Sequence, residues 1–359
     1  MIKIQVSKRN SIEKWKAAGI RIISVVSALV VAGIFISAMG HNPLEVYSSM
    51  IKGGVGSGYA LKETIIKSVP LLIAAIGIAI AFKMKFWNIG AEGQLVMGAF
   101  AASFAALHFK EIPRPILLLL MAVMAVMAGG VWGMIPAIFK AKFKTNETIF
   151  TLMLNYIAIK WITYLQYGPW KDPKAMGFPK IENFSDNGTL PKLFGVHIGV
   201  YIAIIMALLF YVFMKHTKRG YEISVIGESE KTAQYAGMNV GKIIVSTIFL
   251  SGAVCALAGM IQVAGVNRTL EVGIASGNGF TAIIIAWLSN LNPIVMIFIS
   301  FIFAAMVQGG QFIQMAFNIP QSAALVLQGM ILFFVLGGQF FINYRVRFLS
   351  NKGGEKSGQ

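Results

Sequence analysis

The sequence is poor in cysteine and in charged residues. Among its 359 residues there is one cysteine, Cys255, which lies within an apolar run and excludes a disulfide framework or a cysteine-based zinc site. Only 13% of the residues are charged, whereas a soluble domain usually carries about a quarter. Acidic residues number 14 against 31 lysines and arginines, so the formal net charge is +17. Water is therefore not the main solvent of this chain, and Cys255 is expected to be a small packing residue.

Motifs of common enzymes are absent as well. The chain lacks the phosphate-binding loop G-x-x-x-x-G-K-[ST], so it has no P-loop ATPase of its own. It also lacks H-E-x-x-H and G-x-S-x-G, and its four histidines are scattered over predicted loops and span ends. Gly54, Gly56 and Gly58 lack the strand-then-helix context of a dinucleotide site and are expected to form a flexible loop. We expect no catalytic residue, no metal site and no cofactor on this chain.

Hydrophobic residues make up 57% of the sequence and are gathered into long runs. Several runs, such as 22–39, 116–139 and 323–341, approach the ~20 residues that cross a ~30 Å hydrocarbon core as a helix. They do not alternate apolar and polar residues as the strands of a membrane barrel do. The first run follows a long polar segment and precedes no clear cleavage site, so it is expected to be a retained span. The predicted fold class is all-α, a polytopic transmembrane helical bundle.

Basic residues set the predicted topology. They lie between the apolar runs, with no basic stripe interleaved with aromatics, so a nucleic-acid partner is not expected. A cytoplasmic N-terminal segment (1–21), a transmembrane domain (22–342) and a cytoplasmic tail (343–359) place about two thirds of the 31 lysines and arginines inside, as positive-inside sorting requires. Ten spans are expected, with nine or eleven as alternatives. The predicted spans are 22–39, 61–82, 87–107, 116–139, 149–167, 198–214, 243–265, 280–288, 294–317 and 323–341.

Two long connections separate these spans. The external segment 168–197 contains four prolines. The largest cytoplasmic connection, 215–242, includes residues 230–236, which can form a short helix with Ser229 as its N-cap and Gly237 as its terminator. A short helix on the cytoplasmic side of the membrane can serve as a contact surface through which another protein exerts force. The alternative is that this segment is only a solvated connection between two spans. The candidate contact residues are Glu228, Glu230, Thr232, Ala233, Tyr235 and Gly237.

The sharpest polar feature inside an apolar region is the segment 88–94, Asn-Ile-Gly-Ala-Glu-Gly-Gln. Two glycines bracket Glu92, which predicts a broken helix whose polar groups turn toward a cavity. A charged residue near bilayer depth costs ~2.5–3.5 kcal/mol on insertion scales and is a functional candidate by default. One hypothesis is that Asn88, Glu92 and Gln94 line a translocation path. The alternative is that Glu92 neutralises a nearby lysine or ties its span to a neighbouring helix.

A second polar set lies on the span 294–317. Gln308, Gln311 and Gln314 follow one another at intervals of three residues. Amides hydrogen-bond hydroxyls and heterocycle edges without requiring a charged solute, which suits a sugar or nucleoside better than an ion. Interhelical hydrogen bonding is the alternative for each glutamine. Lys160, near two aromatic residues, is expected to snorkel to the outer membrane interface.

Small residues recur every four positions in two spans. This spacing lets helix backbones approach closely where no hydrophobic force joins helices in lipid. The stripes are Ser251, Cys255 and Gly259, and Ala125, Gly129 and Gly133.

Several motifs recur together in one order and spacing between about residues 60 and 340. They are FWNIGAEGQ (86–94), NET (146–148) with MLNYIA (153–158), AQYAGM (233–238), LSGA (250–253) with LAG (257–259), and NP (292–293). In these motifs the sequence resembles the permeases of the branched-chain amino acid and simple-sugar class of ATP-binding cassette (ABC) importers, and within it the nucleoside-permease branch. It departs from the family pattern at Thr281 and Lys231, where that pattern has an acid and a glutamate.

The resemblance implies a division of labour. A periplasmic or surface protein captures the solute, two permease subunits form the path, and ATPase partners that bind ATP and magnesium drive alternating access from the cytoplasm. The resemblance further implies a nucleoside substrate, a heterodimer of two permeases, and a bacterial plasma membrane. It adds Asn155 to the predicted path and assigns the candidate contact residues of the cytoplasmic loop to ATPase coupling.

Other functions stay as alternatives. Within the same class, the solute is a simple sugar or a related compound. An ion-coupled secondary transporter is the main rival from another class, although such proteins usually need several ionisable groups in the membrane and Glu92 is the one strong acidic candidate. An enzyme embedded in the membrane is a weaker rival, because no catalytic motif is present.

Overall fold

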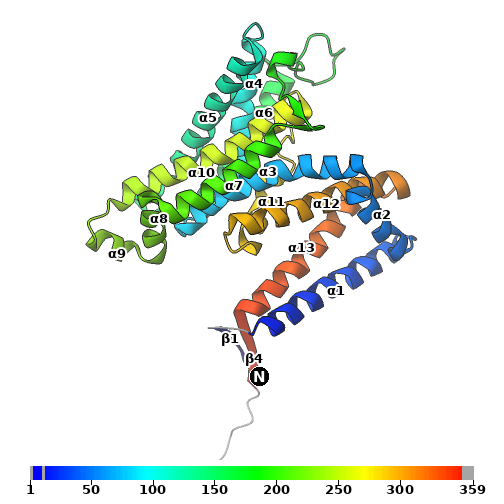
Figure 1. Cartoon of the computed structure of the whole chain (residues 1–359), viewed down its shortest axis with the longest axis vertical. Helices are drawn as coiled ribbons and strands as arrows, with labels where there is room; N and C mark the ends of the chain where they lie inside the picture. Colours follow the sequence, from blue (N-terminus) through cyan, green and yellow to red (C-terminus); the bar gives the residue numbers. More distant parts are fainter. Residues whose placement is uncertain (1–2, 10–12, 350–359) are drawn as a thin grey trace, which may run out of the picture. The chain divides into compact units, whose positions relative to one another are not determined.

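The computed structural model describes residues 3–9 and 13–349 and is mostly helical (Figure 1). Contacts divide the chain into two compact units, one formed by the residues up to Ser57 together with those from Met306 onward (unit 1), the other by Gly58 to Ala305 (unit 2). The first elements are β1 (Lys3–Lys8), α1 (Lys14–Ala38), α2 (Pro43–Val55), α3 (Gly58–Lys83), α4 (Ala91–His108), α5 (Arg114–Phe143) and α6 (Glu147–Tyr167). There follow η1 (Asp186–Gly188), β2 (Lys192–Leu193), β3 (Val196–His197), α7 (Gly199–His216), α8 (Lys218–Glu228) and α9 (Glu230–Tyr235). The last are α10 (Val240–Gln262), the π-helix η2 (Val263–Asn267), α11 (Asn278–Leu288), α12 (Pro293–Phe317), α13 (Gln321–Asn343) and β4 (Tyr344–Leu349).

Eight of the described helices are long and apolar enough to cross a membrane: α1, α3, α5, α6, α7, α10, α12 and α13. At 1.5 Å per residue, α4 with its 18 residues covers about 27 Å, and α11 with its 11 residues covers about 16 Å. With these two, the helices follow the order of the ten predicted spans. The predicted all-α polytopic membrane bundle is confirmed, and α11 is its one short member among the described spans.

Unit 1 is closed by the two ends of the chain. α1 packs along α13, and β1 pairs with β4 in an antiparallel ladder that runs from Lys3 opposite Leu349 to Lys8 opposite Tyr344. Paired strands lie on the same side of a membrane, so the chain crosses it an even number of times. This agrees with ten spans and disagrees with nine or eleven.

The glycine-rich stretch after the first span is helical, which corrects the prediction of a flexible loop. α2 includes Gly54, and Gly58 is the first residue of α3, so Gly56 alone of the three predicted loop glycines lies between the two helices. The neighbouring Gly53 lies so close to the side chain of Phe312 in α12 that no Cβ would fit there. Gly53 therefore allows α2 and α12 to pack closely. The presence of several glycines in a sequence does not by itself distinguish this role from loop flexibility.

α3 is the centre of unit 2. Every residue from Val69 to Phe82 is buried, and α10, α11 and α7 are among the helices that contact α3. Small residues permit close approach: Gly259 of α10 lies against the backbone of α4, and Gly129 of α5 lies against the backbone of α10. The prediction that these stripes bring helix backbones together is confirmed. Cys255 is buried in the same packing, as expected.

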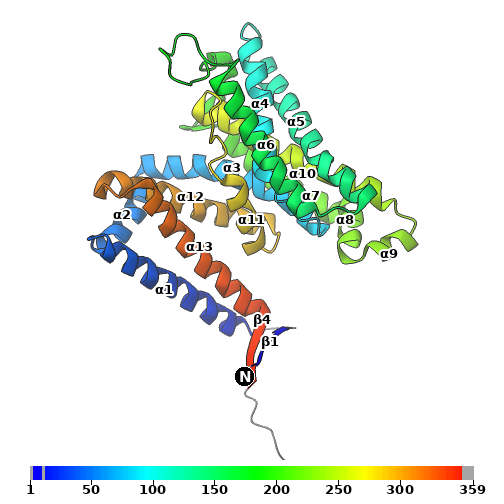
Figure 2. The ribbon, with the colours of Figure 1, turned by 180° about the vertical axis from the view of Figure 1, so that it is seen from behind.

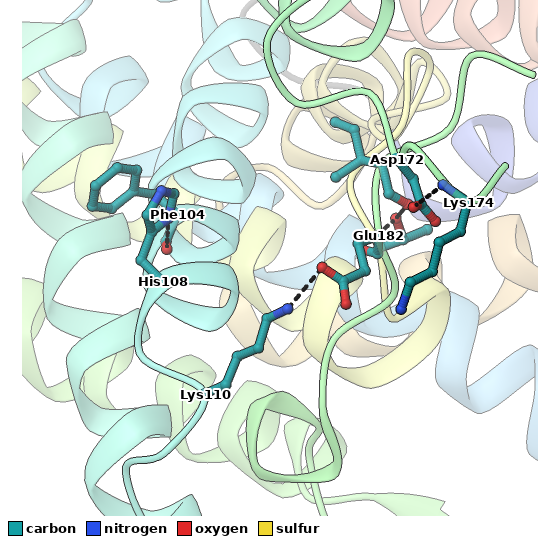
Figure 3. A network of polar contacts seen from close by, with 8 residues as sticks. Phe104, His108, Lys110, Asp172, Lys174 and Glu182 are labelled. Atoms are coloured by element: carbon teal, nitrogen blue, oxygen red, sulfur yellow. Dashed lines mark hydrogen bonds and ion pairs between the residues drawn. The ribbon is translucent and has the colours of Figure 1, made fainter. Parts of the chain in front are cut away.

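The two long connections of unit 2 lie at its opposite ends. Figures 1 and 2 show α8 and α9 at one end and the segment between α6 and α7 at the other. Side chains tie the latter segment to the turn between α4 and α5: Lys110 forms an ion pair with Glu182 at 2.7 Å (Figure 3), and the Arg114 guanidinium donates to the Asp186 carbonyl at 2.8 Å. The predicted external segment is thus fastened to the bundle, although it contains few regular elements.

His197 lies in β3, where this segment returns to the bundle, and is 2% exposed. Its Nδ1 accepts a hydrogen bond from the Gly199 N–H at 3.1 Å, and its ring packs against Gly265 of η2. Its Nε2 has no hydrogen-bond partner among the described residues. Burial, and secondarily the positive charge of Lys192, lower the pKa of His197 from 6.5 to about 4. The ring is therefore neutral at pH 7.

We expect His197 to make the protein less stable in acid. Between pH 6.5 and about 4, the unfolded chain binds a proton at this histidine that the folded chain does not, so stability falls as the pH falls. The loss is roughly 3 kcal/mol at most. The measurement is thermal unfolding in detergent at pH 7.5 and pH 4.5. His197→Asn, which retains an acceptor for Gly199, should reduce the acid-induced drop in Tm by several degrees.

The matched control is His216→Asn, because His216 is exposed at the end of α7. It should show the same acid-induced drop as the unaltered chain. An equal drop in the His197 variant and in this control would contradict the assignment.

Candidate functional site

The candidate site is built around the break between α3 and α4. α3 ends at Lys83, and residues 84–90 form no helix. Lys85 has a left-handed backbone, φ 58°, and the Phe86 N–H returns to the carbonyl of Ala81 at 3.1 Å. A break is therefore present, but it lies at 84–90, earlier than the predicted segment 88–94, and Glu92 itself belongs to the first turn of α4. The break leaves backbone polar groups within the bundle, and these groups need partners because lipid supplies none.

Asn88 is fully buried and holds this break from inside. Its side-chain oxygen accepts from the Gly90 N–H at 3.0 Å and from the Gln94 amide at 3.2 Å. Its side-chain nitrogen donates to Gln94 Oε1 at 3.1 Å and to Ser251 Oγ at 3.2 Å. Ser251 of α10 in turn donates to the carbonyl of Gly77 in α3 at 2.6 Å. The amide of Asn88 therefore links α4 and α10, and through Ser251 it reaches α3.

α6 supplies a second set of partners. Asn155, 1% exposed, accepts from the Gly93 N–H at 2.8 Å and donates to the carbonyl of Ile89 at 2.8 Å. Thr151, one turn earlier in α6, accepts from the Ile89 N–H at 3.2 Å. Because the Gly93 N–H lies in the first turn of α4, it has no partner within its own helix. Asn155 satisfies this donor from a neighbouring helix.

The carboxylate of Glu92 reaches a further helix. Oε1 accepts from the Gly277 N–H at 2.8 Å, and Oε2 accepts from the Gly279 N–H at 2.7 Å. Gly277 is the N-cap of α11 and Gly279 is its second residue, so Glu92 caps α11 and places a negative charge at the positive end of its dipole. Gly279 lies so close to the backbone of Glu92 that no Cβ would fit.

The structure thus brings four predicted path residues into one buried cluster. Asn88, Glu92, Gln94 and Asn155 are each at most 4% exposed and hydrogen-bond to one another or to nearby backbone. The alternative in which Glu92 ties its span to a neighbour agrees with this geometry. In the described part of the chain, Glu92 forms no ion pair with a lysine.

Other members of the cluster were not predicted. Ser251 was identified only as a small packing residue, and Thr151 had no assigned role. Gly277 and Gly279 act through backbone N–H groups, which leave no side-chain signature. The one available signal was the pair of glycines that brackets the start of a short apolar piece.

The predicted glutamine set belongs to unit 1. Gln308 and Gln314 are half-buried and Gln311 is exposed, on the part of α12 that follows residue 305. On α13, Gln328 donates to the carbonyl of Met306 at 3.2 Å, which is an interhelical hydrogen bond of the kind considered as the alternative for such residues.

The connection between α7 and α10 contains two helices, whereas one was predicted. α9 matches the predicted short helix, and α8 precedes it. Ser229 Oγ accepts from the Thr232 N–H at 3.2 Å, and Gly237 ends the helix with φ 75°. The predicted N-cap and terminator are confirmed.

The candidate contact residues of this connection divide between two faces. One of them, Ala233, is fully buried in a core cluster with Met84 and Phe86, which corrects its placement on an outward surface. A short helix needs one apolar side chain to hold it to the bundle. Gly227 lies against the carbonyl of Lys83 with no room for a Cβ. The exposed candidates are Glu228, Glu230, Thr232, Tyr235 and Gly237.

α6 also carries an exposed aromatic face. Tyr156, Trp161 and Tyr164 are 57%, 42% and 60% exposed. With Ile157 and Lys160 they line a shallow groove of about 560 Å³. The rings of Trp161 and Tyr164 lie 5.7 Å apart. α6 therefore has two distinct faces, one that contacts the buried cluster through Asn155 and one that is open.

Comparison with known proteins identifies transport permeases. The family model described as branched-chain amino acid transport system, permease component, matches residues 60–336. The chain is similar to the glucose ABC transporter permease protein TsgB13 of Haloferax volcanii, with 32% identity over 96% of this chain and 94% of that protein. It is similar to two guanosine ABC transporter permease proteins of Bacillus subtilis. NupP is 28% identical over 92% of this chain and 95% of its own length, and NupQ is 26% identical over 64% and 75%.

Glu92→Gln should impair transport while the protein still inserts into the membrane. Glutamine keeps the shape of the side chain, but its amide nitrogen faces an N–H donor and the negative charge at the start of α11 is lost. A hydrogen bond to a charged group contributes ~1.5–3 kcal/mol, so we expect solute uptake to fall about tenfold or more. The measurement is ATP-dependent uptake at matched expression.

Glu111→Gln is the control, because Glu111 is exposed near the start of α5. A second measurement reports on the start of α11 itself, through the accessibility of a thiol placed next to it. Since Cys255 is buried, Ser276→Cys supplies one exposed thiol beside the capped end, and its labelling rate should rise when Glu92→Gln is added. Normal uptake and unchanged labelling would remove Glu92 from the site.

Proposed function

Because the chain belongs to the family of permease components of branched-chain amino acid transport systems, we propose that it carries nucleosides as one permease subunit of an ABC importer. A subunit of this family spans a plasma membrane and is not itself an enzyme. The carried solute, the residues that meet it and the partners that drive it are the proposal. Resemblance to two guanosine permeases is the observation that carries the nucleoside assignment.

A simple sugar is the second candidate. It is favoured by the similarity to a permease named for glucose. Glucose and guanosine share a polyhydroxylated ring, whereas only a nucleoside adds a planar heterocycle. A path for nucleosides therefore needs an apolar, planar surface in addition to groups that hydrogen-bond hydroxyls.

The open face of α6 has the chemistry to receive a heterocycle. Tyr156, Trp161 and Tyr164 present exposed rings on which a base can stack, and their phenol and indole groups can hydrogen-bond at its edge. As a separate part of the proposal, Gln308, Gln311 and Gln314 of unit 1 are path residues, because amides can hydrogen-bond hydroxyl groups of a solute. In this proposal the buried cluster of Asn88, Glu92, Gln94 and Asn155 shapes the path by fixing α4, α6 and α11.

Work from ATP hydrolysis is proposed to enter through α9. Its exposed side offers Glu230, Thr232 and Tyr235 to a partner ATPase that binds ATP and magnesium. Lys231, where the family pattern has a glutamate, is exposed as well, so the partner groove is expected to complement a positive charge there. Ala233 and Gly227 join α8 and α9 to residues at the end of α3, and the same stretch of chain continues to Asn88. In this proposal, a displacement of α9 by the ATPase is transmitted through these contacts to the buried cluster.

Two further partners complete the proposed importer. A second, homologous permease forms the other half of the path, and the resemblance to both NupP and NupQ of one organism supports a pair of unlike subunits. A solute-binding protein delivers the nucleoside on the predicted external side, where the segment between α6 and α7 lies. The predicted cytoplasmic side is the one that carries α8 and α9.

Tyr235→Ala should uncouple the permease from its ATPase. Tyr235 is 92% exposed on α9, so its removal costs little folding stability but deletes the largest side chain offered to the partner. We expect solute-stimulated ATP hydrolysis to fall about tenfold, and co-purification of the ATPase to weaken. Gly237→Val should act in the same direction, because a β-branched residue opposes the positive φ that ends α9.

Tyr221→Ala on α8, 63% exposed, is the matched control and should leave coupling intact. Ala233→Asp is a poor test, since it buries a carboxylate in the core and is expected to damage folding. If both Tyr235→Ala and Gly237→Val retain the ATPase and hydrolyse ATP normally, the coupling role of α9 is wrong.

The solute is tested with the complete importer in proteoliposomes. We expect ATP-dependent accumulation of labelled guanosine that excess unlabelled nucleosides abolish and excess glucose does not. Tyr164→Leu, on the open face of α6, should reduce this uptake several-fold, because a stacking interaction is lost. Tyr59→Leu, an exposed tyrosine at the start of α3, is the control. Accumulation of glucose and not of guanosine would contradict the nucleoside assignment and would identify a sugar as the solute.

A further inference from the structure

A groove runs between α5 and α10 on the surface of unit 2, with a volume of about 610 Å³. Most of its lining is apolar and half-buried, and two lysines stand at one end. The lining residues are Met134, Ile138, Ala141, Lys142, Gly241, Lys242, Val245, Ser246 and Phe249. None of them belongs to the buried cluster, the open face of α6 or α9.

The groove arises because α5 and α10 touch closely along one part of their length and separate along the next. They are in backbone contact at Gly129 and Gly252, and Phe249 covers Gly130, which closes the deep end of the groove. Toward the end of α5 the facing residues are small: the position of a Cβ on Gly241 would be 3.8 Å from the Ala141 Cβ. Ser246 leaves further space on the α10 side. The result is an apolar trough that opens toward the lysines.

Two positive charges at the open end lack local compensation. Lys142 lies in the last turn of α5 and Lys242 in the first turn of α10, and both are exposed. Within residues 13–349, neither amine forms an ion pair, whereas Lys140 is paired with Glu147 at 2.8 Å. An anion placed between Lys142 and Lys242 would therefore meet two charges that no nearby carboxylate neutralises.

The dimensions suit one leaflet of a bilayer. From Lys242 to Phe249 the groove follows α10 for about 10 Å, which is most of the ~15 Å that an acyl chain occupies in half of the hydrocarbon core. In the predicted topology, the charged end lies where α5 leaves the membrane and α10 enters it, which is the expected level of lipid headgroups. Basic pockets between membrane helices bind the headgroups of anionic lipids.

We propose that this groove binds an anionic phospholipid, with an acyl chain along Met134, Val245 and Phe249 and the phosphate between Lys142 and Lys242. The apolar length of the groove distinguishes this occupant from a free anion, which would use only the lysines. The charged end favours an anionic lipid over a zwitterionic one, whose headgroup carries a cation that the two lysines repel. The site is independent of which solute the permease carries.

The test compares lipid retention by the assembled, purified importer. Native mass spectrometry counts bound phosphatidylglycerol and phosphatidylcholine of the same acyl composition. The groove variant is Lys142→Gln with Lys242→Gln. The control is Lys144→Gln with Lys218→Gln, which removes the same charge from exposed lysines at the same end of unit 2 but outside the groove. We expect retained phosphatidylglycerol to fall about tenfold in the groove variant and to be unchanged in the control.

Ser246→Trp fills the trough without altering charge and should cause a similar fall. An equal loss in the control pair would mean diffuse attraction to a basic surface and would overturn the site. Unchanged retention of phosphatidylglycerol by the groove variant would overturn the headgroup assignment. Unchanged retention by Ser246→Trp would overturn the acyl-chain assignment. Displacement of the lipid by inorganic phosphate alone would make it an anion site. Lipid bound to the isolated permease but absent from the importer would assign the groove to a subunit contact.

Discussion

The contact between the Glu92 carboxylate and the first N–H groups of α11 is the interaction on which the arrangement of unit 2 depends. α11 has 11 residues, and the first N–H groups of a helix have no partner within their own helix. A buried carboxylate has the opposite need, since it requires donors and positive potential. The carboxylate accepts from the Gly277 and Gly279 N–H groups at 2.8 and 2.7 Å, so the carboxylate and the helix end each offset the free-energy cost of burying the other.

The same logic explains the amides around the break between α3 and α4. Asn88 and Asn155 each accept and donate, so each can satisfy an N–H and a carbonyl or hydroxyl at once. A continuous path of contacts then leads from α9, through Gly227 and the end of α3, to Asn88 and Glu92. Because buried polar networks have few alternative arrangements, a displacement at α9 is expected to move α4 and α11 together rather than loosen them.

Sequence patterns predicted much of this molecule because its spans and caps are local. Apolar runs, with one short piece at 280–288, predicted the ten spans, and Ser229 with Gly237 marked both ends of α9. A break near segment 88–94 was predicted, since glycines and an acid conflict with a lipid-facing helix, although the break itself covers residues 84–90 and α4 begins at Ala91. What the sequence did not predict depends on partners far along the chain: Glu92 and Gly277 are separated by 185 positions. The helical state of Gly54 and the burial of Ala233 were also missed, because a glycine or an alanine gives no sequence signal of the elements that it packs against.

Unit 1 also has a consequence for how the protein is made. Its helices come from the first 57 residues and from those after 305, so α1 leaves the ribosome long before α13 exists. Until then α2 is available to pack on α1, but the face of α1 that packs on α13 has only lipid or an insertion factor as its neighbour. Unit 2, in contrast, is one uninterrupted stretch and can pack while synthesis continues. Pairing of β1 with β4 must wait until α13, which precedes β4, has been synthesised and inserted.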